Sequence, residues 1–415
     1  MHHTIDLLAA EKRALKELES LIDRTIDTDT IGCYAEHNTL VGLSVRYCGL
    51  TTLPESLGQL SNLQRLDLTG NQLVVLPDWI GQLTRLRKLY LDDNRLAFLP
   101  ESLGELIDLE ELHVDVNQLA ALPASIGQLT CLKRLYLYDN RLTSVPAEIG
   151  QLVDLQEISL GGNQLAWLPE AFWALTKLQT FNVAGNHFSS IPESIGNLVN
   201  LQMLDLAHNA LTSLPETVGK LTNLTHFLYL SNNQLSWLPQ SLENLSKLRY
   251  LNLTDNQFTA LPDWIGKLTQ LRELRLYNNQ LRSLPQSLGN LANLKELHVM
   301  NNQLAALPES IGHLASLKEL RLSDNRLAAL PESLGELTSL TYLDLRNNKV
   351  VAIPKSVGNL SGLTYLDLRA NRFVALPENI GDLTNLEKLD LRWNKLSARA
   401  EWLNRLEQRG CTVYK

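Results

Sequence analysis

Leucine residues return along this chain in a pattern that repeats every 23 residues. A typical unit, residues 53–75, reads LPESLGQLSNLQRLDLTGNQLVV. Its L-x-L segment predicts a short strand whose two leucines point inward while the residue between them points outward. The preceding L-x-x-L segment predicts a return turn that brings further leucines to the same side. One unit cannot bury these leucines alone, so the pattern predicts a stack of repeats around a continuous core.

Proline marks the period. All 15 prolines follow an apolar residue at the start of the return segment, where a missing N–H group costs little. Successive prolines lie 23 residues apart, except for one step of 24 residues between Pro215 and Pro239. No linker interrupts the series, which therefore predicts about 16 short parallel strands, one per unit and one before Pro54.

An asparagine follows the strand of every unit. A buried amide can both donate to and accept from backbone groups that a tight bend leaves unpaired, so these side chains predict a ladder along the stack. They are Asn71, Asn94, Asn117, Asn140, Asn163, Asn186, Asn209, Asn233, Asn256, Asn279, Asn302, Asn325, Asn348, Asn371 and Asn394.

These motifs are similar to those of the leucine-rich repeat family, in its 23-residue class with the pattern LPxxIGxLxxLxxLxLxxNxL. That class is found in Ras-group scaffold proteins, in Roco proteins and in many prokaryotic proteins. The resemblance implies an α/β solenoid, curved into a horseshoe with the strands on its concave face. It also implies a protein partner on that face, and by analogy with the Ras group the candidate is a small GTPase or a signalling enzyme.

Both ends of the chain depart from the repeat and predict caps, which protect the open edges of a stack. Residues 1–40 predict an N-terminal cap with an amphipathic helix over residues 4–23 and a β-hairpin turning at His37–Asn38. The repeats follow over residues 41–396, and residues 397–415 predict a C-terminal helical cap that ends in a short strand. The cap residues expected to face the core are Leu8, Leu15, Leu18, Leu21, Ile22, Trp402, Leu403 and Leu406.

Three units break the pattern. Trp173 and Glu243 replace the glycine of the return segment, and one unit has an extra residue between Leu224 and Leu228. We expect a bulge there that re-aims His226 or the residue after it. Two explanations fit these exceptions: a functional role, or neutral sequence variation in a turn that accepts different residues.

The charge of the chain restricts its partners. With a net charge of −8, it lacks the basic face of a nucleic-acid or anionic-membrane binder. It has neither a signal-peptide pattern at its start nor an apolar run of about 18 residues. Its 4 cysteines show no metal or disulfide spacing, which is typical of a reducing compartment. We therefore expect a cytoplasmic, monomeric protein that binds neither nucleic acid nor membrane.

No catalytic constellation is recognisable. The segments VGKL and IGKL lack the other residues of a phosphate-binding loop. The 9 histidines are dispersed, and His113 and His298 lie on predicted strands far apart in the stack. Neither is a convincing metal ligand, so we expect a non-enzymatic protein without cofactor or metal.

The outward strand residues are the candidates for protein binding. Exposed tyrosine beside arginine is typical of binding hot spots, and it occurs in two zones. The first zone comprises Lys88, Tyr90, His113, Arg134, Tyr136 and Tyr138, with Asp92, Asp93 and Asp115 beside them. The last zone comprises Tyr342, Asp344, Arg346, Tyr365, Asp367, Arg369, Asp390, Arg392 and Trp393. Between them, residues 159–207 carry small side chains, among them Gly162 and Gly185, which a partner backbone could approach closely.

The last zone contains the sequence LDLR three times, at residues 343–346, 366–369 and 389–392. Its Asp and Arg lie on the same strand face, so one interpretation is a self-compensating ion lattice on an exposed surface. The alternative is a partner site, because aromatic residues border the charged columns.

A second class of function also fits the pattern. Many microbes build secreted or surface recognition and effector proteins from these repeats. A secretion route would distinguish such a protein from a cytoplasmic scaffold.

Overall fold

The computed structural model describes residues 7–22, 32–397 and 401–415, which form two compact units, Met1–Asp205 and Leu206–Lys415. The helix and strands of the first unit are α1 Ala9–Ile22, β1 Tyr34–Glu36, β2 Thr39–Ser44, β3 Arg65–Asp67, β4 Lys88–Tyr90, β5 Glu111–His113, β6 Arg134–Tyr136, β7 Glu157–Ser159, β8 Thr180–Asn182 and β9 Met203–Asp205. Its 3-10 helices are η1 Glu55–Gln59, η2 Asp78–Gln82, η3 Glu101–Glu105, η4 Ala124–Gln128, η5 Ala147–Gln151, η6 Glu170–Ala174 and η7 Glu193–Asn197.

The second unit continues the same alternation. Its strands and α-helix are β10 Phe227–Tyr229, β11 Tyr250–Asn252, β12 Glu273–Arg275, β13 Glu296–His298, β14 Glu319–Arg321, β15 Tyr342–Asp344, β16 Tyr365–Asp367, β17 Lys388–Asp390, α2 Glu401–Gln408 and β18 Thr412–Tyr414. Its 3-10 helices are η8 Glu216–Lys220, η9 Gln240–Asn244, η10 Asp263–Lys267, η11 Gln286–Asn290, η12 Glu309–His313, η13 Glu332–Glu336, η14 Lys355–Asn359 and η15 Glu378–Asp382.

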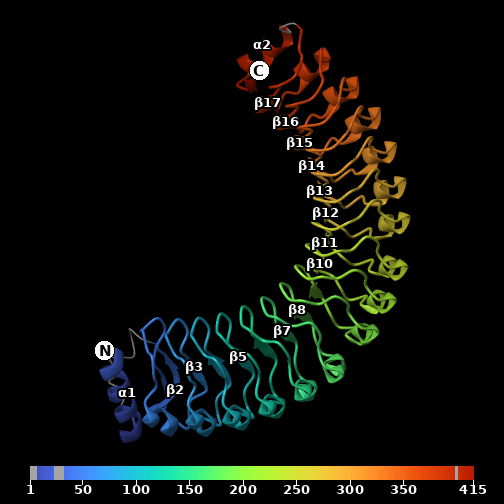
Figure 1. Cartoon of the computed structure of the whole chain (residues 1–415). Helices are drawn as coiled ribbons and strands as arrows, with labels where there is room; N and C mark the ends of the chain where they lie inside the picture. The colour runs from blue at the N-terminus through green and yellow to red at the C-terminus, as the bar shows by residue number, and fades with distance from the viewer. Residues whose placement is uncertain (1–6, 23–31, 398–400) are drawn as a thin grey trace. The chain divides into compact units, whose positions relative to one another are not determined.

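Each unit is a solenoid of repeats, as the leucine pattern predicted. The strands β2 to β17 supply the 16 predicted repeat strands, and in both units they line one side while the 3-10 turns line the other (Figure 1). Neighbouring strands pair in parallel with equivalent residues opposite each other, so that Leu66 lies beside Leu89 and Leu89 beside Leu112. These leucines are fully buried or nearly so. Each unit therefore has one continuous leucine core between its sheet and its turns.

The predicted asparagine ladder is confirmed. The Asn94 amide donates to the carbonyls of Leu68 and Leu91 at 3.0 Å, and its oxygen accepts the Leu73 N–H at 3.1 Å. The same three contacts recur in other repeats, for example at Asn325. Each amide therefore ties its own strand to the preceding repeat and satisfies backbone groups at the bend.

The glycine of the return segment is required by the contact between repeats. A Cβ on Gly127 would lie 2.7 Å from the Glu148 carbonyl oxygen, and one on Gly289 would lie 2.5 Å from that of Ser310. These glycines are needed because the next repeat packs against them. Where Trp173 replaces glycine, its ring is almost fully buried and packs edge-on against Phe172.

The residue before each ladder asparagine adopts a left-handed backbone conformation. Gly162 and Gly185 occupy this slot with φ of 65° and 66°, as Asp93 does with φ of 54°. The small size of these two glycines therefore has a backbone reason that is independent of any partner. Val116 occupies the same slot with φ of 55°, a strained conformation for a β-branched residue.

The N-terminal cap departs from the prediction at two leucines. Helix α1 buries Ala14, Leu15, Leu18 and Ile22 against the first repeat, but Leu8 and Leu21 are 55% and 49% exposed. Glu11 is buried in the same face because its carboxylate accepts the backbone N–H groups of Leu8 and Leu40. The predicted residues 4–6 and 23 of this helix lie outside the described part of the chain.

The hairpin and the C-terminal cap are as predicted. His37 and Asn38 form the turn with φ of 50° and 62°, and the returning strand β2 is itself the first repeat strand. In α2, the residues expected inside, Trp402, Leu403 and Leu406, are buried. Neither α-helix of the described ranges is long and apolar enough to cross a lipid bilayer.

The extra residue before β10 does not disturb the strand pairing on its C-terminal side. The chain bends at His226, and Phe227 then pairs with Tyr250 in the regular parallel register. A bend also precedes β8 and β9, whose repeats have no extra residue, so the expected bulge is not seen in the pairing of β10 with β11.

Replacing Val116 by asparagine should stabilise the protein. Asparagine tolerates the left-handed conformation, so Val116→Asn should raise the free energy of unfolding by about 1 kcal/mol. Urea unfolding would measure this as a higher midpoint with an unchanged slope. Val74→Asn is the matched control, because Val74 is also half exposed but lacks a positive φ. An equal gain in both variants would contradict the backbone explanation.

Candidate functional site

The first zone contains a stack of three rings on adjacent strands. Tyr90, His113 and Tyr136 lie opposite one another in the register of β4, β5 and β6. The His113 ring lies 4.5 Å from each tyrosine ring, between centroids, and is tilted by 46° to both. The structure thus brings together three of the residues that the sequence pattern proposed for binding.

Glu111 holds this stack in place, and it was not among the predicted site residues. Its buried carboxylate accepts the Tyr90 hydroxyl at 2.9 Å, lies 2.9 Å from the Lys88 ammonium, and accepts an N–H from Arg134. Burial opposes ionisation, but these donors outweigh it and lower the pKa of Glu111 to about 2. The sequence could have revealed this role of Glu111, because the 23-residue period places Glu111 between Lys88 and Arg134 on the neighbouring strands.

The tyrosine hydroxyls of the stack are already engaged. Burial, then the bond to Glu111, raises the pKa of Tyr90 to about 12, and burial and a bond to Glu157 raise the pKa of Tyr136 as well. The Arg65 guanidinium lies 4.4 Å from the centre of the Tyr90 ring. The stack therefore offers a partner fixed ring surfaces and cations rather than free hydroxyl groups.

An acidic column runs beside the stack. The Asp92 carboxylate accepts the Asp115 N–H at 2.8 Å, and the Asp115 carboxylate accepts the Tyr138 N–H at 2.6 Å. Burial, and then repulsion by Asp92, raises the pKa of Asp115 to about 6 despite that hydrogen bond. Tyr138 itself is 46% exposed and is the most accessible ring of this zone.

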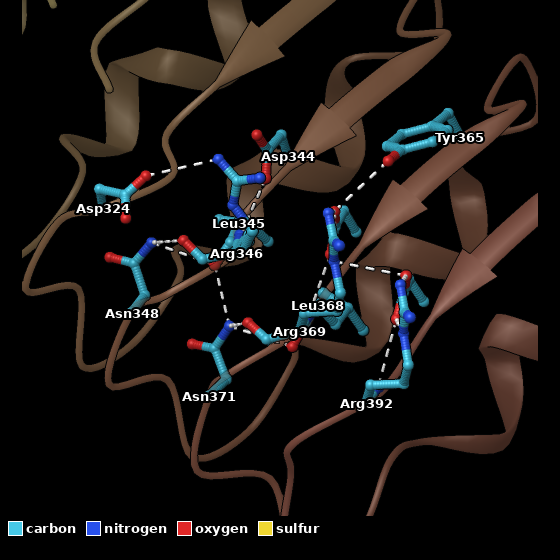
Figure 2. A network of polar contacts seen from close by, with 12 residues as sticks. Asp324, Asp344, Leu345, Arg346, Asn348, Tyr365, Leu368, Arg369, Asn371 and Arg392 are labelled. Atoms are coloured by element: carbon cyan, nitrogen blue, oxygen red, sulfur yellow. Dashed lines mark hydrogen bonds and ion pairs between the residues drawn. The ribbon is translucent and has the colours of Figure 1, made fainter. Parts of the chain in front are cut away.

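The last zone also begins with stacked rings. Tyr342 and Tyr365 lie parallel, with 4.3 Å between centroids and 2° between planes. The Tyr365 hydroxyl donates to Asp367 at 3.3 Å (Figure 2). Arg321 lies over Tyr342 and Lys388 over Tyr365, at 4.8 and 5.1 Å. These cation–ring contacts orient the tyrosines from both sides.

Two of the LDLR arginines pair with the aspartates as the ion-lattice interpretation expects, but the aspartates are buried, so the lattice is not an exposed one. Asp344, Asp367 and Asp390 are 6%, 1% and 1% exposed. Each carboxylate accepts the backbone N–H two residues later, at 2.9, 3.0 and 3.3 Å. Asn252 makes the same contact with the Thr254 N–H in another repeat. The acid in this slot therefore has a structural role: it closes the bend after the strand.

The arginines cover these buried acids unequally (Figure 2). Arg369 donates to Asp367 at 2.9 Å and lies 3.3 Å from Asp390, so it bridges two strands. Arg392 donates to Asp390 at 2.6 Å, which helps to lower the pKa of that carboxyl against the effect of burial. Arg346 instead reaches Asp324, at 3.5 Å. The groups left for a partner are the exposed parts of Arg346 and Arg392, and Trp393, which is 71% exposed.

A third aromatic cluster was missed by the sequence pattern. Phe227 stacks against Tyr229 with 5.5 Å between centroids, and Tyr250 lies 5.4 Å from Phe227 and 5.0 Å from Tyr229. Arg275 lies over Tyr250 at 5.4 Å. The cluster joins two rings of β10, Phe227 and Tyr229, to Tyr250, which lies opposite Phe227 on β11.

Asp115→Asn should make the protein more stable at neutral pH. A pKa raised from 3.8 to about 6 means that folding favours the protonated acid. Its contribution to stability is complete below pH 3.8 and is lost as the pH rises through about 6. Asparagine keeps the oxygen that accepts from Tyr138 but carries no charge. The variant should therefore have the higher melting temperature at pH 7.5, and the difference should disappear near pH 4.

Asp108→Asn is the control for this experiment, since Asp108 is exposed on a turn of the same repeat. A gap between wild type and Asp115→Asn that does not change with pH would contradict the assignment.

Comparison with known proteins agrees with this architecture. A family model for a leucine-rich repeat region matches residues 38–122, 170–246, 238–326 and 311–408, and a second leucine-rich-repeat model matches 107–165 and 132–188. No curated protein sequence gave a significant match to the chain.

Solved structures extend the comparison. A leucine-rich-repeat protein of Leptospira interrogans is 39% identical, with a TM-score of 0.84, over 90% of this chain and 95% of that one. A TDR receptor is 31% identical, with a TM-score of 0.70, over 85% and 68%. The Arabidopsis receptor kinase HAESA, in complex with the peptide hormone IDA and the co-receptor SERK1, is 26% identical, with a TM-score of 0.70, over 98% and 79%. The chain belongs to the leucine-rich-repeat family.

Proposed function

We propose that the chain is a non-enzymatic scaffold that binds a partner protein on the strand face of its repeats. Leucine-rich repeats are interaction scaffolds, and the observation that carries the proposal is the stack of Tyr90, His113 and Tyr136. Its rings are held by Glu111 and Glu157 before any partner arrives. Pre-ordered aromatic side chains lose little conformational entropy on binding, which favours affinity.

The partner we propose follows from the family class. By analogy with Ras-group repeat proteins, it is a small GTPase or a signalling enzyme, bound by a monomeric scaffold in the cytoplasm. The exposed thiol of Cys131 and the buried thiol of Cys411 support a reducing compartment, because neither forms a disulfide.

A secreted or surface recognition protein of a microbe is the second candidate. The receptor among the similar structures supports a recognition role, and the 39% identity to a Leptospira interrogans protein supports a microbial source. HAESA was solved with a bound peptide hormone, so a solenoid of this fold holds a peptide ligand in that receptor. Detection of the native protein outside the cell would favour this candidate.

The ring stack of the first zone should carry most of the binding. A variant with Tyr90, Tyr136 and Tyr138 changed to alanine should capture far less partner from the native lysate than wild type does. Loss of a buried aromatic hot spot typically costs 2 kcal/mol or more, about a thirtyfold loss of affinity. Quantitative mass spectrometry of the captured proteins would measure the change, and circular dichroism would confirm that the variant is folded.

The matched control is a second triple variant in the last zone, with Tyr342, Tyr365 and Trp393 changed to alanine. Retention of the partner by this control, with loss in the first variant, would assign the first zone. The reverse result would assign the last zone. Equal capture by wild type and both variants would rule out the strand faces of these two zones as the binding surface.

A further inference from the structure

The tetrapeptide ELHV occurs twice on the strand face, in different surroundings. It comprises residues 111–114 on β5 and residues 296–299 on β13. In the first copy, register places Glu111 between the cations Lys88 and Arg134. In the second copy, Glu296 lies between two further acids, Glu273 and Glu319. The glutamate is thus flanked by cations in one place and by acids in the other, where Arg275 and Arg321 flank the histidine instead.

The histidine of the second copy points into this acidic row. His298 is only 8% exposed, and its Nε2 atom makes no hydrogen bond. That atom lies 3.5 Å from a Glu296 carboxylate oxygen and 3.3 Å from a Glu319 oxygen. One ligand atom from each of Glu273, Glu296 and His298 can be chosen so that all lie within 4.8 Å of one another.

The row has too few cations for its carboxylates. Arg275 donates to Glu273 at 2.5 Å, and Arg321 donates to Glu319, so each outer glutamate has a partner on its own strand. For Glu296, His298 is the basic group at ion-pair distance within the described ranges. Like charges opposite one another on adjacent strands are unfavourable, and a bound cation would offset this repulsion.

We propose that Glu273, Glu296 and His298 bind a divalent transition-metal ion of the zinc class. Zinc takes imidazole nitrogen and carboxylate oxygen at about 2.0–2.2 Å, which places neighbouring donors of a tetrahedral site about 3.4 Å apart. The 3.5 Å separation of His298 Nε2 from Glu296 matches this spacing, and the ligand atom of Glu273 lies within 4.8 Å of both. The imidazole favours zinc over calcium or magnesium, which prefer all-oxygen sites. Glu319 or water is available for the fourth position.

The same face offers an internal control. His113 has the same flanking residues in the chain, but its glutamate is already bound by Lys88, Tyr90 and Arg134. A second cation at Glu111 would meet all of these groups, whereas at the proposed site Arg275 holds Glu273 and leaves Glu296 to the metal. The proposal therefore distinguishes two histidines that the linear sequence does not.

The test is a titration of zinc chloride into the full-length, tag-free chain after chelator treatment, followed by isothermal calorimetry. Wild type and His113→Ala should bind one zinc ion with similar affinity, whereas His298→Ala should bind it more than about tenfold more weakly. Absence of zinc binding by wild type, or full retention by His298→Ala, would overturn the proposal.

A second variant separates metal binding from folding. Glu296→Gln removes the central charge, so the metal-free variant should melt at the same temperature as wild type or higher. Zinc should raise the melting temperature of wild type but not of this variant, because a ligand stabilises only the state that binds it. An equal rise in both proteins would place the zinc elsewhere and refute the site.

Discussion

Each repeat leaves its leucines, its strand amides and its bend carbonyls unsatisfied until the next repeat packs against it. This one requirement sets the residue types at the leucine, asparagine and glycine slots. The ladder asparagine bridges two repeats, for example from Asn94 to the Leu68 carbonyl. Glycine in the return turn leaves room for the carbonyl of the following repeat, as at Gly127. Because every repeat must meet its neighbour in the same register, these slots tolerate little variation.

The same register decides what the surface can do. Residues 23 positions apart in the chain become cross-strand neighbours, so the chemistry is organised in columns across the strands. A column of rings becomes the stack around His113, and a column of aspartates becomes a buried row that closes successive bends. Only the side chains that remain after these structural contacts are available to a partner. Trp393 and Tyr138 belong to that remainder, whereas Asp367 does not.

The repeat strands and the ladder could be predicted from the chain because they depend on the 23-residue periodicity, and the caps could be predicted because both ends depart from it. The role of Asp367 could not be predicted, because a residue that points outward from a strand is not always exposed to solvent. The short carboxylate of Asp367 accepts a backbone N–H two residues later, and the Arg369 side chain covers it. Glu111 was overlooked because its importance lies in residues 23 positions away on either side. Leu8 precedes the first residue of α1, and Leu21 lies outside the buried face of the helix that Leu15, Leu18 and Ile22 form.

Residues in equivalent slots of the repeat can have different neighbours on the adjacent strands, so sites with the same local sequence can differ in chemistry. Arg346, Arg369 and Arg392 occupy one slot, yet Arg346 turns to Asp324 because the repeat before it offers an acid there. The two ELHV segments differ for the same reason: cations flank Glu111 and acids flank Glu296. In a solenoid, the chemical environment of a side chain on the strand face is thus set by its own repeat and by the repeats on either side. Exchange of a whole repeat therefore alters the chemistry of both of its neighbours, which constrains how such a surface acquires a new partner.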